Sequence, residues 1–323
     1  MFKSMDIGID LGTANILVFV RGKGVVLKEP SVVAIDKTRN KVLAVGDAAR
    51  EMLGRSPGNI VAIRPLKEGV IANYTITQKL LAHVIEKVAG KCLFFKPRVM
   101  TCVPIGITSV EKRAVMEATT QGGASKTYLI EEPLAAALGA GIDISVPRGN
   151  MVVDIGGGTT DIAILSLGGI VNSSSIRIAG TAFDNDIVKY IKDKYKLLVG
   201  DRTAEDIKVT IGTVFPGSRN EKMEVRGRDL VTGLPHSVTI TSDEVEEALR
   251  ESIYTIIHAA KGILEQTPPE LSADIVNKGI FLTGGGALLH NLDQFLEQGL
   301  GVPVFVAENA LDCVAAGCGI MLE

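Results

Sequence analysis

One short pattern, an apolar stretch followed by Asp-x-Gly and then a second apolar stretch, occurs twice in this chain. The first copy has Asp10 and Gly12 at its turn, and the second has Asp154 and Gly156, 144 positions further on. That spacing is the size of a whole domain, and a chain of 323 residues has room for about two. The repeat therefore predicts two similarly folded lobes that face one another and bring the two carboxylates to one cleft.

Strand-like and helix-like segments alternate around this pattern. Helical periodicity marks residues 76–88, which end before Gly90, and a Thr108/Glu111 capping box opens a helix that continues to Gly122. The strand-like segments are residues 7–20, 25–28, 99–103, 127–130 and 162–167. This alternation is typical of an α/β fold.

Residues 180–255 do not match the first half of the chain, and we interpret them as an insertion in the second lobe. The helix predicted from Ser242 has an apolar stripe that continues to Leu264, and Pro268-Pro269 ends it. We expect this stripe to lie in the core.

Composition excludes several classes of function. The 34 Lys and Arg residues against 37 Asp and Glu residues give a net charge of −3, which offers no basic field to attract nucleic acid. The 4 cysteines form no Cys-x-x-Cys pair, which indicates free thiols in a reducing cytoplasm. Asp6 and Asp10 interrupt the segment where a signal peptide needs its apolar core, and no stretch reaches the ~18 apolar residues of a spanning helix. We expect a soluble protein that at most lies on a membrane surface and binds no nucleic acid.

Three glycine-rich turns each follow an apolar strand, at residues 10–15, 154–160 and 283–287. Because glycine lacks a Cβ atom, backbone amides in such turns can approach phosphate oxygens closely. Asp10 and Asp154 would suit a Mg²⁺ ion that keeps most of its water ligands beside a polyphosphate. Neither the P-loop pattern nor a Gly-x-Gly-x-x-Gly pattern after a strand is present. The sequence therefore predicts a magnesium-nucleotide site between the lobes.

Seven segments carry a resemblance to a known family. They are Ile7-Gly-Ile-Asp-Leu-Gly-Thr-Ala-Asn15, Glu29-Pro-Ser-Val-Val33, Arg55-Ser-Pro-Gly-Asn-Ile-Val61, Ile130-Glu-Glu-Pro133, Asp154-Ile-Gly-Gly-Gly-Thr-Thr-Asp161, Gly227-Arg-Asp-Leu230 and Thr283-Gly-Gly-Gly-Ala-Leu288. The chain resembles, essentially end to end, the MreB family of bacterial actins with its MreB, Mbl and MreBH branches. Actins, Hsp70 proteins and sugar kinases share the Asp turns but lack the segments that begin at Glu29 and Arg55.

The resemblance implies a two-lobed α/β fold of the actin, Hsp70 and sugar-kinase superfamily, with duplicated mixed sheets and two smaller inserted subdomains. The implied first lobe core (IA) comprises residues 1–30, 68–143 and 310–323, and its insertion (IB) comprises 31–67. The second lobe core (IIA) would comprise 144–179 and 256–309, with the insertion IIB at 180–255.

The resemblance also implies a function. Members of this family are ATPases that bind ATP and Mg²⁺ and assemble into filaments of paired protofilaments. They lie in the cytoplasm on the inner face of the cell membrane, where they act with the cell-wall elongation machinery to organise wall synthesis and rod shape. We expect the same of this chain.

The resemblance assigns nucleotide-binding residues to this chain at the positions that match the family's segments. The implied set is Gly12, Thr13, Ala14 and Asn15 in the first phosphate turn, Gly156, Gly157, Gly158 and Thr159 in the second, Glu205, Asp206, Ile207 and Lys208 at the ribose and adenine, and Gly284, Gly285, Gly286, Ala287 and Leu288 on the other side of the adenosine. Glu205 and Lys208 share one face of a helix for which the sequence predicts a Thr203/Asp206 capping box. Without the family pattern, this pair reads as a solvated surface ion pair.

The resemblance assigns the catalytic step to Glu131, which would position the attacking water with Thr159 as a second support. The metal ligands would be Asp10 and Asp154, acting through water. We expect the neighbouring Glu132 to face the helix start and to act mainly as a cap. Without the family pattern, both glutamates read as helix capping.

Leu93, Phe94 and Phe95 form an apolar cluster in a chain with 4% aromatic residues, and basic residues flank it. Burial statistics alone favour a buried edge of the first lobe. The family binds membranes through a comparable apolar loop, so we expect this segment to insert shallowly beside anionic headgroups.

Two further classes of protein share this superfamily. A metabolite kinase would need a second substrate pocket with a catalytic base, and no such motif is found in the sequence. A chaperone-type ATPase would need a substrate domain after the nucleotide lobes, whereas this sequence ends at Glu323. We therefore expect a filament-forming ATPase.

Overall fold

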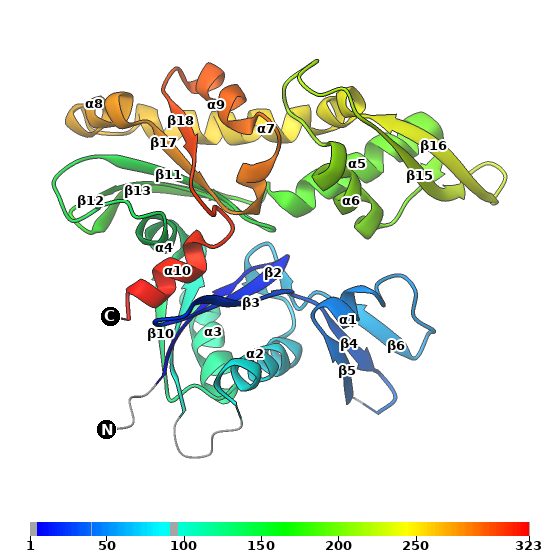
Figure 1. Cartoon of the computed structure of the whole chain (residues 1–323), viewed down its shortest axis with the longest axis horizontal. Helices are drawn as coiled ribbons and strands as arrows, with labels where there is room; N and C mark the ends of the chain where they lie inside the picture. Colours follow the sequence, from blue (N-terminus) through cyan, green and yellow to red (C-terminus); the bar gives the residue numbers. More distant parts are fainter. Residues whose placement is uncertain (1–4, 40, 91–95, 323) are drawn as a thin grey trace.

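The computed structural model describes residues 5–39, 41–90 and 96–322. Its elements form two lobes, each built around a five-stranded mixed sheet (Figure 1). The first sheet has the order β10 (Lys126–Glu131), β9 (Arg98–Val103), β1 (Asp6–Leu11), β2 (Asn15–Val20) and β3 (Gly24–Pro30). The second has the order β13 (Gly169–Ile176), β12 (Thr160–Ser166), β11 (Asn150–Ile155), β17 (Ile280–Thr283) and β18 (Val304–Val306).

Both sheets follow one connection rule. Three strands that are consecutive in the chain pair antiparallel, and two later strands extend the sheet in parallel from the first of them. The duplicated α/β lobes predicted from the repeated Asp-x-Gly turn are therefore confirmed.

The prediction of one interrupted strand over residues 7–20 was wrong. The chain reverses at residues 12–14, so β1 and β2 are antiparallel neighbours with Leu11 opposite Ile16. A Cβ atom on Gly12 would lie 2.6 Å from the Asn15 carbonyl oxygen, which explains why glycine is needed at this reversal. Ser31 holds the turn by donating a hydrogen bond of 2.6 Å to the Gly12 carbonyl oxygen.

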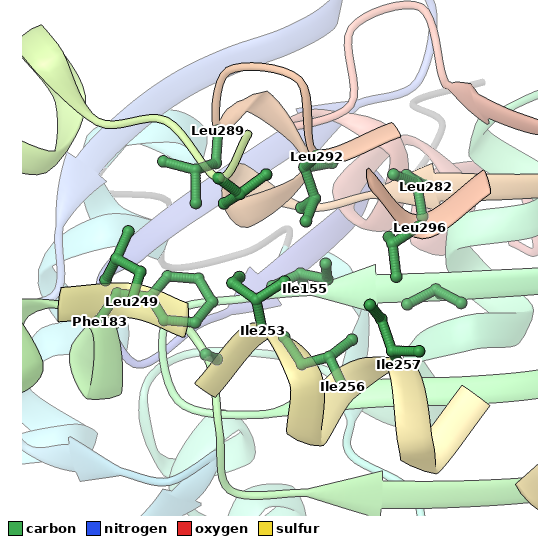
Figure 2. Close-up of a cluster of buried hydrophobic side chains, with 14 of the residues drawn as sticks. Ile155, Phe183, Leu249, Ile253, Ile256, Ile257, Leu282, Leu289, Leu292 and Leu296 are labelled. Atoms are coloured by element: carbon green, nitrogen blue, oxygen red, sulfur yellow. The ribbon is translucent and has the colours of Figure 1, made fainter. Parts of the chain in front are cut away.

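Helices pack on the outer faces of the two sheets. Against the first sheet lie α2 (Tyr74–Ala89) and α3 (Ser109–Gln121), whose predicted capping box at Thr108 and Glu111 is present. The second core is covered by α7 (Ser242–Glu265), α8 (Pro269–Lys278) and α9 (Leu292–Leu300). The apolar stripe of α7 is buried there, as predicted, and Figure 2 shows Leu249, Ile253 and Ile256 pointing into this core.

Each lobe carries a smaller sheet that lies toward one end of the long axis (Figure 1). In the first lobe it consists of β5 (Lys41–Val45), β4 (Val33–Asp36) and β6 (Ile60–Ile63), with α1 (Asp47–Arg50), and the hairpin β7 (Leu66–Lys67) and β8 (Val70–Ile71) follows it. In the second lobe it consists of β14 (Leu197–Leu198), β15 (Lys222–Asp229) and β16 (Pro235–Thr241), with α5 (Gly180–Tyr195) and α6 (Asp201–Ile211). The expected limits of the four segments IA, IB, IIA and IIB stay a prediction.

Across the part of the chain that the structure describes, no helix combines the length and the apolar character that a membrane span needs.

Two helices lie between the lobes, α4 (Glu132–Gly139) and α10 (Cys313–Ile320), shown in Figure 1. They share one buried cluster with Cys102 of the first sheet and Val152 of the second. The helices cross in backbone contact, because a Cβ atom on Gly317 would lie 1.8 Å from the Ala135 carbonyl oxygen and one on Gly139 would lie 1.8 Å from the Cys313 carbonyl oxygen. The relative position of the lobes therefore depends on this crossing of α4 and α10.

We predict that Gly317→Ala destabilises the protein by about 2–3 kcal/mol, because neither backbone can move away without disturbing a sheet. This should lower the midpoint of thermal unfolding by roughly 5 °C or more. Gly262→Ala is the matched control, since Gly262 lies in α7 with nothing within 4 Å of an added Cβ atom. Gly262→Ala should leave the stability unchanged or raise it slightly. An equal loss of stability in both variants would contradict the close crossing of α4 and α10.

Candidate functional site

A cavity of about 350 Å³ lies between the two lobes and is lined by residues of both. The structure brings most of the expected site residues to this one cavity. Its lining includes Asp10, Gly12, Thr13, Ala14, Asn15, Asp154, Gly156, Gly157, Gly158, Thr159, Glu205, Lys208, Gly284, Gly285, Gly286 and Leu288. These residues come from three glycine-rich turns and from α6, so segments more than 250 residues apart in the chain meet here.

Three residues of the expected nucleotide set do not line the cavity. Ile207 and Ala287 are buried in the second core, and Asp206 is exposed. Successive helix positions differ by about 100°, so α6 presents Glu205 and Lys208 to the cavity while Asp206 points to solvent and Ile207 to the core. The capping box predicted at Thr203 is not the start of this helix, because α6 begins at Asp201 with Gly200 as its N-cap.

The first and second glycine turns touch each other. A Cβ atom on Gly157 would lie 2.6 Å from the Cβ atom of Ala14, and one on Gly158 would lie 2.8 Å from the backbone nitrogen of Gly69. Gly69 in turn donates a backbone hydrogen bond of 3.0 Å to the Thr13 hydroxyl. The glycines are therefore required by the approach of the two lobes as well as by any phosphate between them.

Asp10 and Asp154 lie where β1 and β11 meet these turns. The Thr283 hydroxyl donates a hydrogen bond of 2.7 Å to Asp154 Oδ1, and the Cys102 thiol lies 3.4 Å from Asp10 Oδ1. Burial raises the pKa of Asp10 to about 6 and that of Asp154 to about 7. Among the ion pairs within the described residues, none involves either carboxylate. The site thus holds two buried acidic groups with no cation beside them.

The expectation that Glu132 acts mainly as a helix cap was wrong. Its side chain is 9% exposed and lines the cavity, and burial, followed by repulsion from Asp161, Asp154 and Asp10, raises the pKa of its carboxyl group well above the usual range. Glu131 does not line the cavity: its side chain is 40% exposed and its Oε1 atom lies 3.6 Å from Lys112 Nζ. Adjacent residues at the junction of β10 and α4 point in different directions, and the Glu-Glu sequence does not show which one turns inward.

The two polar residues of α6 that line the cavity are already paired. Lys208 Nζ lies 2.7 Å from Asp184 Oδ1 and donates a hydrogen bond of 3.0 Å to the Gly180 carbonyl oxygen. Glu205 Oε2 lies 3.0 Å from Arg50 Nη2 and 3.6 Å from Arg64 Nη2. Both α6 residues therefore face the cavity from a fixed position.

Sequence reasoning missed several residues of the cavity. These are Arg64, Gly69, Gly180, Thr181, Asp184 and Arg219. Gly180 and Thr181 follow β13, which contains Asn172 and three serines, so no apolar strand marks this turn in the sequence. Arg64 reaches the site through a hydrogen bond of 3.2 Å to the Ala14 carbonyl oxygen, 50 residues away, and no local pattern indicates such a contact. The expected membrane segment at Leu93, Phe94 and Phe95 lies outside the described residues.

Comparison with known proteins identifies the family. The family model described as MreB/Mbl protein matches residues 4–323. The chain belongs to the MreB/Mbl family. It is 62% identical to the cell shape-determining protein Mbl of Bacillus subtilis (strain 168) over 98% of this chain and 96% of that protein. It is 52% identical to the cell shape-determining protein MreB of Escherichia coli (strain K12) over 99% of this chain and 94% of that protein.

Solved structures agree with this assignment. MreB5 of Spiroplasma citri bound to AMPPNP is 40% identical and superposes with a TM-score of 0.93, covering 99% of this chain and 96% of that one. The same protein bound to ADP gives the same values. A MamK double helical filament, 22% identical, covers 99% of both chains with a TM-score of 0.82 and shares the fold. The two-lobed actin-like fold expected from the sequence is confirmed, and the chain is an actin-like protein of a cell-shape family.

The buried acidic pair predicts a pH dependence for the protein without nucleotide or metal. The pKa of Asp154 is about 7 in the folded protein against a reference value of 3.8, so stability should fall as the pH rises from about 4 to 7 and then level off. Asp154→Asn removes the charge and keeps an acceptor for Thr283. We expect this variant to be more stable than the parent at pH 8, by about 2 kcal/mol, with a smaller gain at pH 5.

Thermal unfolding in EDTA at pH 5 and pH 8 measures this difference. Asp143→Asn is the control, because Asp143 is exposed and hydrogen bonds from Ser145 lower its pKa, so its ionisation does not change in this interval. A gain for Asp154→Asn that is equal at both pH values would contradict the assignment to ionisation.

Proposed function

We propose that this chain is a filament-forming ATPase that lies on the inner face of the cell membrane and organises cell-wall synthesis and rod shape. One observation carries the proposal: three glycine turns and two buried aspartates meet around a single cavity between the lobes. The MreB5 relative, at 40% identity, has been solved with AMPPNP and with ADP. A metabolite kinase or chaperone-type ATPase loses support, since the family match covers residues 4–323 and the relatives are cell shape-determining proteins.

We propose one orientation for ATP in the cavity. The turns at residues 12–15 and 156–159 lie close to Asp10 and Asp154, and their backbone amides support a position of the phosphates at this end. Glu205 and Lys208 on one side and Gly284–Leu288 on the other would then border the adenosine. Leu288, 57% exposed at the cavity, offers an apolar surface to the base. A volume of about 350 Å³ is within the range of small-ligand sites.

Asp10 and Asp154 fit a magnesium ion held through its water shell. The described residues contain no group of three His, Cys, Asp or Glu side chains placed to bind a metal directly. Two buried carboxylates without a cation are suited to an ion that keeps its waters and binds the phosphates as well. Mg²⁺ would neutralise phosphate charge during transfer. Cys102 and Thr283 hold the two carboxylates in place through the contacts described above.

For the attacking water, we propose Glu131 with Thr159 as the positioning pair. Thr159 lines the cavity, and Glu131 would reach it by releasing Lys112, an exposed and therefore weak ion pair. Glu132 lines the cavity, but burial and repulsion from Asp161, Asp154 and Asp10 disfavour its charged form, which is the form that could accept a proton from water.

The two glutamates can be separated by kinetics. We predict that Glu131→Ala leaves ATP affinity largely intact and lowers single-turnover hydrolysis by roughly 10²-fold, the scale of losing a positioned acid or base. Glu132→Gln keeps the size and hydrogen-bonding capacity of the side chain and should hydrolyse ATP within a few-fold of the parent. If Glu132→Gln abolishes hydrolysis while Glu131→Ala does not, the role belongs to Glu132; if neither changes it, Thr159 is the next residue to test.

One sedimentation experiment tests filament assembly and membrane binding together. With ATP and Mg²⁺ the protein should sediment as filaments, which electron microscopy should show as antiparallel pairs of protofilaments, and with liposomes it should co-sediment. Replacing Leu93 and Phe94 by Ser should abolish liposome binding, because about two large apolar side chains supply only a few kcal/mol per subunit and filaments multiply this term. Nucleotide binding by this double variant is the control.

Two results would contradict this reading. Monomers under every nucleotide and lipid condition would overturn the filament, and loss of folding in the double variant would support a buried edge at residues 93–95.

A further inference from the structure

Glu205 is held by two arginines from the opposite lobe. It lies on α6 in the second lobe, whereas Arg50 ends α1 and Arg64 follows β6, both in the small sheet of the first lobe. The distances from Glu205 Oε2 are 3.0 Å to Arg50 Nη2 and 3.6 Å to Arg64 Nη2. In Figure 1, α1 and α6 face one another across the space between the lobes. One carboxylate therefore ties the two smaller sheets together.

This contact is shielded from water more than a surface ion pair. The side chains of Arg50, Arg64 and Glu205 are 29%, 28% and 20% exposed. Partial burial reduces screening, so each pair is worth more than an exposed one. A second ion pair between the lobes, Arg177 with Glu68 at 2.9 Å, has an arginine that is 72% exposed and should contribute less.

The same contact reaches the cavity. Glu205 and Arg64 line it, and Arg64 Nη1 donates a hydrogen bond of 3.2 Å to the carbonyl oxygen of Ala14 in the first glycine turn. Arg50 is outside the lining and reaches the cavity only through its ion pair with Glu205.

We propose that Arg50 is a positioning residue for the nucleotide site: together with Arg64 it holds Glu205 in a clasp between the lobes, and this clasp slows nucleotide release. The proposal rests on the nucleotide site argued above. A ligand enclosed by both lobes leaves when they separate, and separation of α1 from α6 requires the Arg50 ion pair to break. The clasp should therefore act on the dissociation rate more than on the association rate.

The test compares two substitutions of Arg50 with a matched control. Release of radiolabelled ADP after a chase with unlabelled ADP should be about fivefold faster in Arg50→Gln, the effect of losing one partly buried ion pair. Arg50→Lys keeps the charge and should restore release to within about twofold of the parent. Arg250→Gln is the control, because Arg250 pairs with Glu246 one turn away within the same helix, α7. Raising the KCl concentration should speed release from the parent more than from Arg50→Gln.

A second readout needs no nucleotide. Amide hydrogen exchange in α6 of the nucleotide-free protein should be faster in Arg50→Gln than in Arg250→Gln, although the substitution lies in the other lobe. Release and exchange equal to the control would overturn the clasp, and equal acceleration by the Gln and Lys variants would show that charge is not the cause. If the parent binds no nucleotide, the proposed function fails, while exchange in α6 still decides whether Arg50 joins the lobes.

Discussion

Backbone contact between the two repeated turns is the constraint on which the rest of this structure depends. Gly157 lies against Ala14 and Gly158 against Gly69, closer than any side chain at those glycines would allow. The crossing of α4 and α10 imposes the same requirement, with Gly139 against the backbone of Cys313 and Gly317 against the backbone of Ala135. These contacts set how closely the lobes approach, which brings both aspartate-bearing strand ends to one cavity. A larger residue at any of these glycines would move the lobes, and with them both halves of the site.

That constraint has an electrostatic cost. Asp10, Asp154 and Glu132 line one cavity, and burial raises the pKa of each. Asp161 joins them, its pKa also raised by burial, while it accepts a hydrogen bond of 2.9 Å from the backbone of Ile105 in the other lobe. A cluster of this kind does not stabilise a fold by itself. It is suited to a bound cation and a polyphosphate, and this agrees with a family in which MreB5 has been solved with nucleotide.

Much of the fold and of the site was predictable from the sequence, and the errors share a cause. The glycine turns, the two aspartates and the face of α6 that line the cavity were predicted because each depends on residues within one turn or one helix. The single strand over residues 7–20 was wrong because the glycine-rich turn at residues 10–15 reverses the chain completely, and the sequence of the turn does not show whether it interrupts a strand or reverses it. Glu132 was assigned to capping because a Glu-Glu pair before proline fits a helix start equally well in either orientation. Asp206, Ile207 and Ala287 were included because their neighbours in the chain belong to the site, although their own side chains point elsewhere.

The sequence by itself determined the elements and their chemistry: strands from apolar runs, turns from glycine, and acidic groups at the ends of two repeated strands, all of which depend on local backbone preference. Only the tertiary structure decided which side chains share a space. The pairing of Arg50 and Arg64 with Glu205, the place of Gly69 between the two turns and the inward direction of Glu132 follow from how two lobes pack. Each of these contacts joins residues that no helical or strand period relates, so their geometry exists only once the chain has folded.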